Sequence, residues 1–176
     1  MLNSKKNTIK NICLIGLMGS GKTVIGKELS QILDLNFIDT DEEIENNIGK
    51  SIKKIFEEHG ESFFRKIEEQ ICLRVLENKN SIISLGGGSV INKNIRNSMK
   101  NNSYSIFINV EPDIILKRLG NSKKRPLLNN INKELILRNL FNERIKYYNQ
   151  ADLIINNNFD KKEIIKKITA ELKKYD

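Results

Sequence analysis

The stretch GLMGSGKT at residues 16–23 fits the pattern G-x-x-x-x-G-K-[ST] without a mismatch. The segment before it, ICLI at residues 12–15, is a short apolar run of the kind that a buried strand uses. The segment after it, residues 24–33, places its apolar side chains on one face of a helix. A strand, a glycine-rich loop and a helix in this order are the parts needed to hold a polyphosphate, so the stretch predicts a nucleotide site.

The chemistry of this loop depends on its backbone and on two side chains. Its glycines let successive N–H groups point inward, and the N-terminus of the following helix adds a partial positive charge. We expect Lys22 to reach the β- and γ-phosphates of ATP and the Thr23 hydroxyl to ligate Mg²⁺. The alternative, a glycine-rich turn that binds nothing, is disfavoured by the strand and helix around the loop. The residues expected to contact the nucleotide here are Gly19, Ser20, Gly21, Lys22, Thr23 and Val24.

Length and composition indicate a single domain over residues 1–176. Apolar residues make up 39% of the chain, and no apolar run approaches the roughly 20 residues of a membrane span. Residues 1–10 are polar and lack the apolar core of a signal peptide. We therefore expect a cytoplasmic protein with no membrane partner, acting as a monomer.

The net charge of +8 raises the question of nucleic-acid binding. The lysines, however, are scattered among asparagines and isoleucines, with no basic stripe between aromatic residues and no RNA-binding motif. We expect no nucleic-acid partner, because the positive charge also suits a pocket for several anionic groups. Cys13 and Cys72 lack metal-ligand spacing and His59 is the only histidine, which argues against zinc or a Cys–His nucleophile.

Predicted strands alternate with predicted helices along the whole chain. This alternation indicates an α/β protein whose parallel sheet is covered by helices on both faces. The expected strands are residues 12–15, a short run ending at Asp39, 81–85, 104–110 and 152–155. The expected helices are residues 24–33, 42–48, 51–59, 61 to about 78, about 92–99, 111–120, about 133–149 and 161–173.

Two carboxylates, Asp39 and Asp41, follow the second predicted strand. In an open parallel sheet, ligands bind at the edge where the carboxyl ends of the strands lie. One carboxylate could hold Mg²⁺, and the other could accept a proton or hydrogen bond from an attacking hydroxyl group. The alternative is a helix N-cap with one extra surface acid. The neighbouring phosphate loop favours the site.

The segment GESFFRKIE at residues 60–68 places Glu61, Arg65 and Glu68 on one helical face. This arrangement has two interpretations. It could be an ordinary surface ion pair, worth a few tenths of a kcal/mol. It could instead hold an arginine rigid for bidentate binding of a carboxylate.

Gly86, Gly87 and Gly88 come directly after the third predicted strand. Each glycine costs conformational entropy relative to alanine. Three in a row indicate a backbone that a ligand must approach closely.

Two further arginines are candidates for binding anionic groups. Arg125 lies in the basic loop at about 120–130, where a small kinase would carry a lid, and could stabilise charge on a transferring phosphoryl group. Arg144 lies on the following predicted helix, ahead of Tyr147 and Tyr148. A solvated helix charge is the alternative for Arg144.

These motifs, in this order, resemble those of the shikimate kinases, which are small phosphate-loop kinases. The resemblance extends from about residue 11 to the last helix, and its carriers are GLMGSGKT, DTD at 39–41, GE-x-x-FR-x-x-E from Gly60, GGG at 86–88, RPLL from Arg125 and R-x-x-Y-Y-x-x-A-D from Arg144. It implies transfer of the ATP γ-phosphoryl group to the 3-hydroxyl of shikimate, in aromatic amino-acid biosynthesis. It also implies a three-layer α/β/α fold with a five-stranded parallel sheet of order 2-3-1-4-5, shikimate-binding helices at about 41–78 and a closing lid.

On the nucleotide side, the resemblance implies that Lys22 and Thr23 bind the phosphates and Mg²⁺, with Asp39 supporting the metal. Arg125 corresponds to the lid arginine, and Arg118 resembles the family arginine that stacks on adenine. The segment at 155–158 is hard to align, so adenine contacts beyond Arg118 stay open.

On the acceptor side, the resemblance implies that Asp41 binds the shikimate hydroxyls and is the candidate base. Arg65 and Arg144 correspond to the arginines that hold the shikimate carboxylate, with the backbone at 86–88 lining the pocket. Two alternatives stay open: a gluconate- or adenylate-kinase-like enzyme of the same fold, and a catalytically silent nucleotide-binding regulator.

Overall fold

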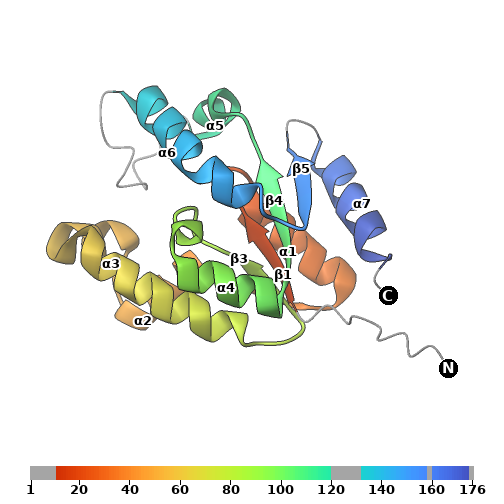
Figure 1. Ribbon diagram of the computed structural model, residues 1–176, viewed down its shortest axis with the longest axis horizontal. Helices are drawn as coiled ribbons and strands as arrows, with labels where there is room; N and C mark the ends of the chain where they lie inside the picture. The colour runs from red at the N-terminus through yellow and green to blue at the C-terminus, as the bar shows by residue number, and fades with distance from the viewer. Residues whose placement is uncertain (1–10, 120–131, 158–159, 175–176) are drawn as a thin grey trace.

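A computed structural model describes residues 11–119, 132–157 and 160–174, and its centre is a parallel sheet (Figure 1). The sheet has five strands in the order β2-β3-β1-β4-β5, which confirms the expected topology. The middle strand, β1, pairs in parallel with β3 on one side and β4 on the other. The strands are β1 Asn11–Ile15, β2 Asn36–Asp39, β3 Ser81–Ser84, β4 Tyr104–Asn109 and β5 Leu153–Asn156.

Helices cover both faces of this sheet and complete three layers (Figure 1). Helices α1 and α7 contact each other on one face, while α3, α4 and α6 lie across the other. Among the helices of the described residues, none is long and apolar enough to cross a membrane. The helices are α1 Lys22–Leu33, α2 Thr40–Ile48, α3 Ile52–Leu76, α4 Lys93–Asn102, α5 Pro112–Leu119, α6 Lys133–Tyr148 and α7 Lys161–Leu172, with a 3₁₀ turn, η1, at Ser89–Ile91.

Burial of β1 between its neighbours explains why its sequence is apolar. All of its residues are buried, as expected for a strand covered by helices on both faces. Because the strands are parallel, their carboxyl ends meet at one edge of the sheet. The phosphate loop follows β1, Asp39 ends β2, and the glycines at 86–88 follow β3, so the sheet brings all three segments together.

Two helices begin two residues earlier than the sequence predicted. Helix α1 begins at Lys22 rather than at residue 24, and α2 begins at Thr40 rather than at residue 42. The second difference arises because the Asp39 side chain caps α2, accepting a hydrogen bond from Asp41 N, which places Asp41 in the first helical turn. The turn η1 was not predicted.

The break expected at residue 60 is confirmed as a kink within α3. Gly60 has φ 77° and ψ 175°, a conformation that is essentially restricted to glycine. The kink separates the N-terminal turns of α3, capped by Ser51, from the segment that carries Arg65. Arg125 and the expected lid at about 120–130 lie outside the described residues.

Candidate active site

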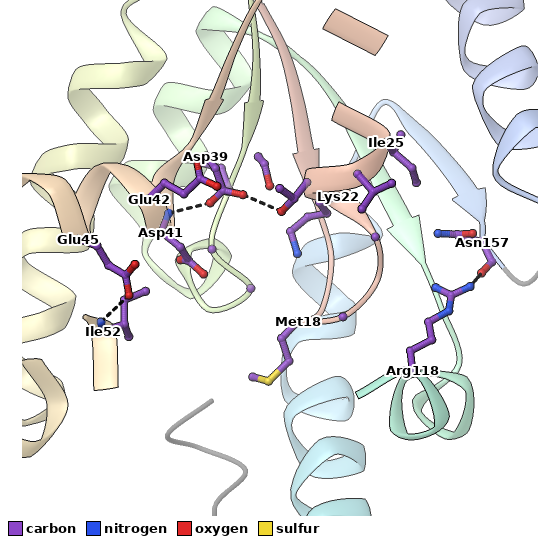
Figure 2. Close-up of a pocket in the computed structure, with 18 of the residues that line it drawn as sticks. Met18, Lys22, Ile25, Asp39, Asp41, Glu42, Glu45, Ile52, Arg118 and Asn157 are labelled. Carbon is purple, nitrogen blue, oxygen red and sulfur yellow. Dashed lines mark hydrogen bonds between the residues drawn. The ribbon is translucent and has the colours of Figure 1, made fainter. Parts of the chain in front are cut away.

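A cleft of about 770 Å³ opens at the carboxyl edge of the sheet. Figure 2 shows the phosphate loop and Lys22 at its centre, with Asp39 and Asp41 on one side and Arg118 and Asn157 on the other. The structure therefore brings the predicted phosphate loop and the predicted carboxylates into one site.

The phosphate loop has a backbone shape that its glycines allow. Gly16 and Gly21 have φ values of 143° and 96°. A side chain at Gly16 would place its Cβ 2.6 Å from the carbonyl oxygen of Ile108, so β4 excludes any larger residue there. The Lys22 ammonium group donates hydrogen bonds to the carbonyl oxygens of Gly16 at 2.9 Å and Leu17 at 3.0 Å. These contacts keep the buried lysine folded against its own loop.

Thr23 and Asp39 present oxygen atoms side by side at the start of α1. Thr23 Oγ1 donates a hydrogen bond to Asp39 Oδ2 at 2.7 Å. Hydroxyl and carboxylate oxygens suit Mg²⁺, which commonly combines one or two protein ligands with waters and substrate phosphates. The described residues contain no group of three or more His, Cys, Asp or Glu side chains that could hold a metal by itself. The donor set thus fits a metal that nucleotide phosphates help to hold.

Asp41 points toward the glycine segment that follows β3. Its backbone N–H donates to Asp39 Oδ1 at 3.0 Å, which holds the Asp39 carboxylate against the first turn of α2 (Figure 2). A Cβ added at Gly86 would lie 2.8 Å from Asp41 Oδ1. The Asp41 carboxylate therefore packs on Gly86 and faces the cleft.

Arg65 is held between two acids on α3. Its Nη1 donates to Glu68 Oε2 at 2.7 Å, and its Nη2 donates to Glu61 Oε1 at 2.9 Å. Glu61 is exposed, but Glu68 is only 3% exposed, so the pair with Glu68 is no ordinary surface ion pair. Burial raises the pKa of the Glu68 carboxyl above its ordinary value, although Arg65 acts in the opposite direction.

The glycines at 86–88 lie close to other groups of the protein itself. A Cβ at Gly87 would lie 3.1 Å from Met18 N in the phosphate loop, and one at Gly88 would lie 2.6 Å from Arg65 Nη1. The sequence predicted close approach by a ligand, and the structure shows close approach by the phosphate loop and Arg65. This segment is therefore the junction between two halves of the site: the nucleotide half, which contains the phosphate loop, and the acceptor half, which contains Arg65.

Arg144 and Tyr148, one turn apart on α6, face the same junction. Arg144 is only 2% exposed, so the alternative of a solvated helix charge is wrong. Its Nε is buried and has no hydrogen-bond partner within the described part of the chain. The Tyr148 hydroxyl donates to the Gly87 carbonyl oxygen at 2.5 Å, and its ring stacks on Phe107 with centroids 4.9 Å apart. Burial raises the pKa of Tyr148 far above its ordinary value, so the phenol stays neutral.

A small cavity joins these groups into an acceptor pocket. Asp41, Arg65 and Arg144 line it together with the glycines at 86–88. Apolar side chains form one wall of the pocket beside these charged groups. A guest with a carboxylate at one end and hydroxyl groups at the other would match this lining. The wall residues are Met18 of the phosphate loop and Ile52, Phe56 and Phe64 of α3, which the sequence did not single out individually as pocket residues.

Arg118 lies across the phosphate loop from the acceptor pocket. Its Nη2 donates to the carbonyl oxygen of Asn157 at 2.8 Å (Figure 2). Arg118 is exposed, as expected of a side chain that is available to stack on adenine. Asn157 lies in the segment that could not be aligned, so no sequence signal identified it.

A phosphate loop on a 2-3-1-4-5 parallel sheet, facing a pocket lined by two carboxylates and two arginines, defines a small-molecule kinase of the phosphate-loop class. The chain belongs to the shikimate kinase family, whose family model matches residues 18–173. Enzymes of this family are ATP-dependent kinases that act on a hydroxyl group of shikimate.

Relatives support this assignment along nearly the whole chain. The chain is similar to the shikimate kinase of Aquifex aeolicus, with 40% identity over 92% of this chain and 95% of that protein. The structure of the Acinetobacter baumannii shikimate kinase in complex with shikimate covers 94% of this chain and 93% of its own, with 32% identity and a TM-score of 0.91. A gluconokinase from Sinorhizobium meliloti, at 14% identity and a TM-score of 0.57 over 94% of this chain and 92% of its own, shows likeness of fold alone.

Proposed function

We propose that this chain phosphorylates the 3-hydroxyl of shikimate with ATP, using the acceptor pocket between the phosphate loop and α6. The observation that carries the proposal is that Arg65 and Arg144 line one small pocket together with Asp41. Two guanidinium groups suit a carboxylate, and a carboxylate residue beside the phosphate loop suits a hydroxyl group about to react. Shikimate carries both groups.

On the nucleotide side, the backbone N–H groups of the phosphate loop and the Lys22 ammonium group bind the polyphosphate. Lys22 exchanges its hydrogen bonds with the loop carbonyls for the β- and γ-phosphate oxygens. Thr23 and Asp39 would hold Mg²⁺, which would neutralise part of the phosphate charge. Arg118 stacks on the adenine ring. Arg125 of the lid stabilises the charge on the transferring phosphoryl group.

On the acceptor side, Arg65 and Arg144 hold the shikimate carboxylate and so fix the orientation of the ring. The 3-hydroxyl oxygen attacks the γ-phosphorus, the bond from that phosphorus to the β–γ bridging oxygen breaks, and ADP leaves. Asp41 accepts the hydroxyl proton. Glu68 is buried and holds one nitrogen of Arg65, so it orients that guanidinium group.

Two alternatives compete with this proposal. Gluconate also carries a carboxylate and AMP carries a phosphate, so the paired arginines do not exclude them; the match to the shikimate kinase family favours shikimate. A silent regulator would have no use for the lysine, the carboxylates and the acceptor arginines together. We expect the protein to act in the cytoplasm, where ATP is available as co-substrate. We also expect it to act as a monomer.

The test is ADP release coupled to a spectroscopic readout, with ATP, Mg²⁺ and a panel of acceptors: shikimate, quinate, gluconate, AMP and none. Turnover with shikimate alone is the expected result. Turnover with gluconate or AMP alone would keep the phosphate loop and discard the acceptor assignments. Silence with every acceptor, in a protein that binds ATP, would favour the regulator.

A further inference from the structure

Asn157, directly after β5, connects two parts of the nucleotide site that are distant in sequence. Its backbone N–H donates to the Asn109 carbonyl oxygen at 2.7 Å, which extends the pairing of β4 and β5 by one residue. Its side-chain Nδ2 donates to the carbonyl oxygen of Ser20 in the phosphate loop at 2.7 Å. Its own carbonyl oxygen accepts from Arg118 at 2.8 Å. The residue is only 6% exposed, so water competes little for these bonds.

The bond to Ser20 also positions the Gly21 N–H, a group expected to donate a hydrogen bond to the phosphates, because both belong to the same peptide group. The Ser20 carbonyl and the Gly21 N–H belong to one planar trans peptide, so they point in opposite directions. This peptide joins Ser20 to Gly21, whose φ is 96°. A donor that holds the carbonyl on the sheet side therefore keeps the Gly21 N–H on the opposite side, toward the position of the phosphates.

Packing strengthens this coupling. A Cβ added at Gly21 would lie 3.0 Å from Asn157 Nδ2, so the amide sits directly against the loop. The same residue holds the Arg118 guanidinium group through its carbonyl, and Figure 2 shows Arg118 and Asn157 together on the base side of the loop. A movement of Asn157 would thus shift both the Gly21 N–H, which is expected to bind phosphate, and Arg118, which is expected to stack on adenine.

We propose that Asn157 is a positioning residue for ATP, which sets the phosphate loop and Arg118 relative to one another. The inference rests on the nucleotide site of the proposed function. It concerns the nucleotide half alone, because Asn157 does not line the acceptor pocket.

Two substitutions at Asn157 and one at its neighbour test this role. Asn157→Asp keeps the shape but turns an acceptor toward the Ser20 carbonyl, and Asn157→Leu removes the donor without adding charge. Asn156→Asp is the matched control: Asn156 Oδ1 accepts from Asn109 Nδ2 at 2.9 Å, which a carboxylate also does. The control therefore adds the same charge one residue away and keeps the hydrogen bond that the side chain of residue 156 accepts.

The readout is calorimetric titration of ADP and of ATP with Mg²⁺, without acceptor, followed by the KM values of both substrates and a thermal unfolding midpoint. We expect both Asn157 variants to lose about tenfold in nucleotide affinity, and the KM for shikimate to change less than about twofold. Asn156→Asp should match the wild type.

Equal nucleotide affinity in Asn157→Asp and Asn156→Asp would overturn the proposal. So would a lowered unfolding midpoint with equal losses for both substrates, because that pattern belongs to a purely structural residue. Nucleotide binding is read here without shikimate, so a protein that failed to phosphorylate shikimate would still give a clear answer.

Discussion

The phosphate loop draws its phosphate-binding groups from consecutive residues, whereas the acceptor pocket takes its side chains from four separate segments of the chain. The loop folds on itself, with Lys22 bonded to the carbonyls of residues 16 and 17. In the acceptor pocket, Asp41, Arg65 and Arg144 meet only because α2, α3 and α6 pack around the glycines at 86–88. A local motif can therefore bind phosphate in many proteins, while the identity of the acceptor depends on tertiary packing.

The largest effect should come from Asp41→Asn, which tests whether the acceptor half performs the chemistry. The amide cannot accept the proton of the hydroxyl, so we expect kcat to fall by about a thousandfold. ATP affinity should stay near that of the wild type, since the phosphate loop is untouched. Steady-state kinetics and a nucleotide titration measure both quantities. Near-normal turnover would remove Asp41 from the mechanism.

Arg144→Ala tests whether the two halves bind separate substrates. Removing one of two guanidinium groups from a buried carboxylate site should raise the KM for shikimate by about a hundredfold. The KM for ATP should change little. Arg144→Lys is the control, because it keeps the charge and loses the planar fork, and it should recover only part of the loss. A change confined to ATP would contradict the carboxylate assignment.

Gly60→Ala tests whether the acceptor half depends on a strained backbone. A side chain at φ 77° and ψ 175° costs about 1–3 kcal/mol, which should appear as a lower free energy of unfolding in urea. Gly49→Ala is the matched control: Gly49 also has a positive φ, of 70°, but lies at the C-cap of α2, where a side chain is less costly. Equal losses at both positions would mean that the kink imposes no special constraint.

Tyr148→Phe should have the smallest effect, since it removes one hydroxyl and leaves the stacking on Phe107 intact. Loss of the bond to Gly87 loosens the junction between the halves, and we expect catalytic efficiency toward shikimate to fall by about fivefold. Tyr147→Phe provides the control, because the ring of Tyr147 packs on Arg96 and its replacement keeps that contact. An unchanged efficiency in Tyr148→Phe would show that the glycine segment holds its position without help.

The sequence predicted the parts of the molecule that depend on local chemistry. The phosphate loop, the strand order implied by the family resemblance and the break at Gly60 are all present in the structure. The start of α2 was predicted two residues late, because the Asp39 side chain is at once the N-cap and a neighbour of Thr23. An aspartate at position 39 is expected both for a helix N-cap and for a metal ligand, and the sequence alone does not show which role it has.

The rest required packing that no local pattern encodes. Whether Glu68 and Arg144 face solvent or the interior depends on which helix face meets the sheet, and both proved to be buried. Tyr148 and Asn157 act on backbone carbonyls far away in the chain, at Gly87 and Ser20. Such contacts leave no spacing rule in the sequence.

The most direct test of the central claim is the structure of the product. The protein is incubated with ATP, Mg²⁺ and shikimate, and the product is analysed by ³¹P and ¹H NMR while ADP is quantified. We expect a single product whose phosphorus couples to the proton on carbon 3 of the shikimate ring, formed in equal amount to ADP. Phosphate on another hydroxyl, or ADP accompanied only by inorganic phosphate, would contradict the placement of the acceptor between Asp41, Arg65 and Arg144.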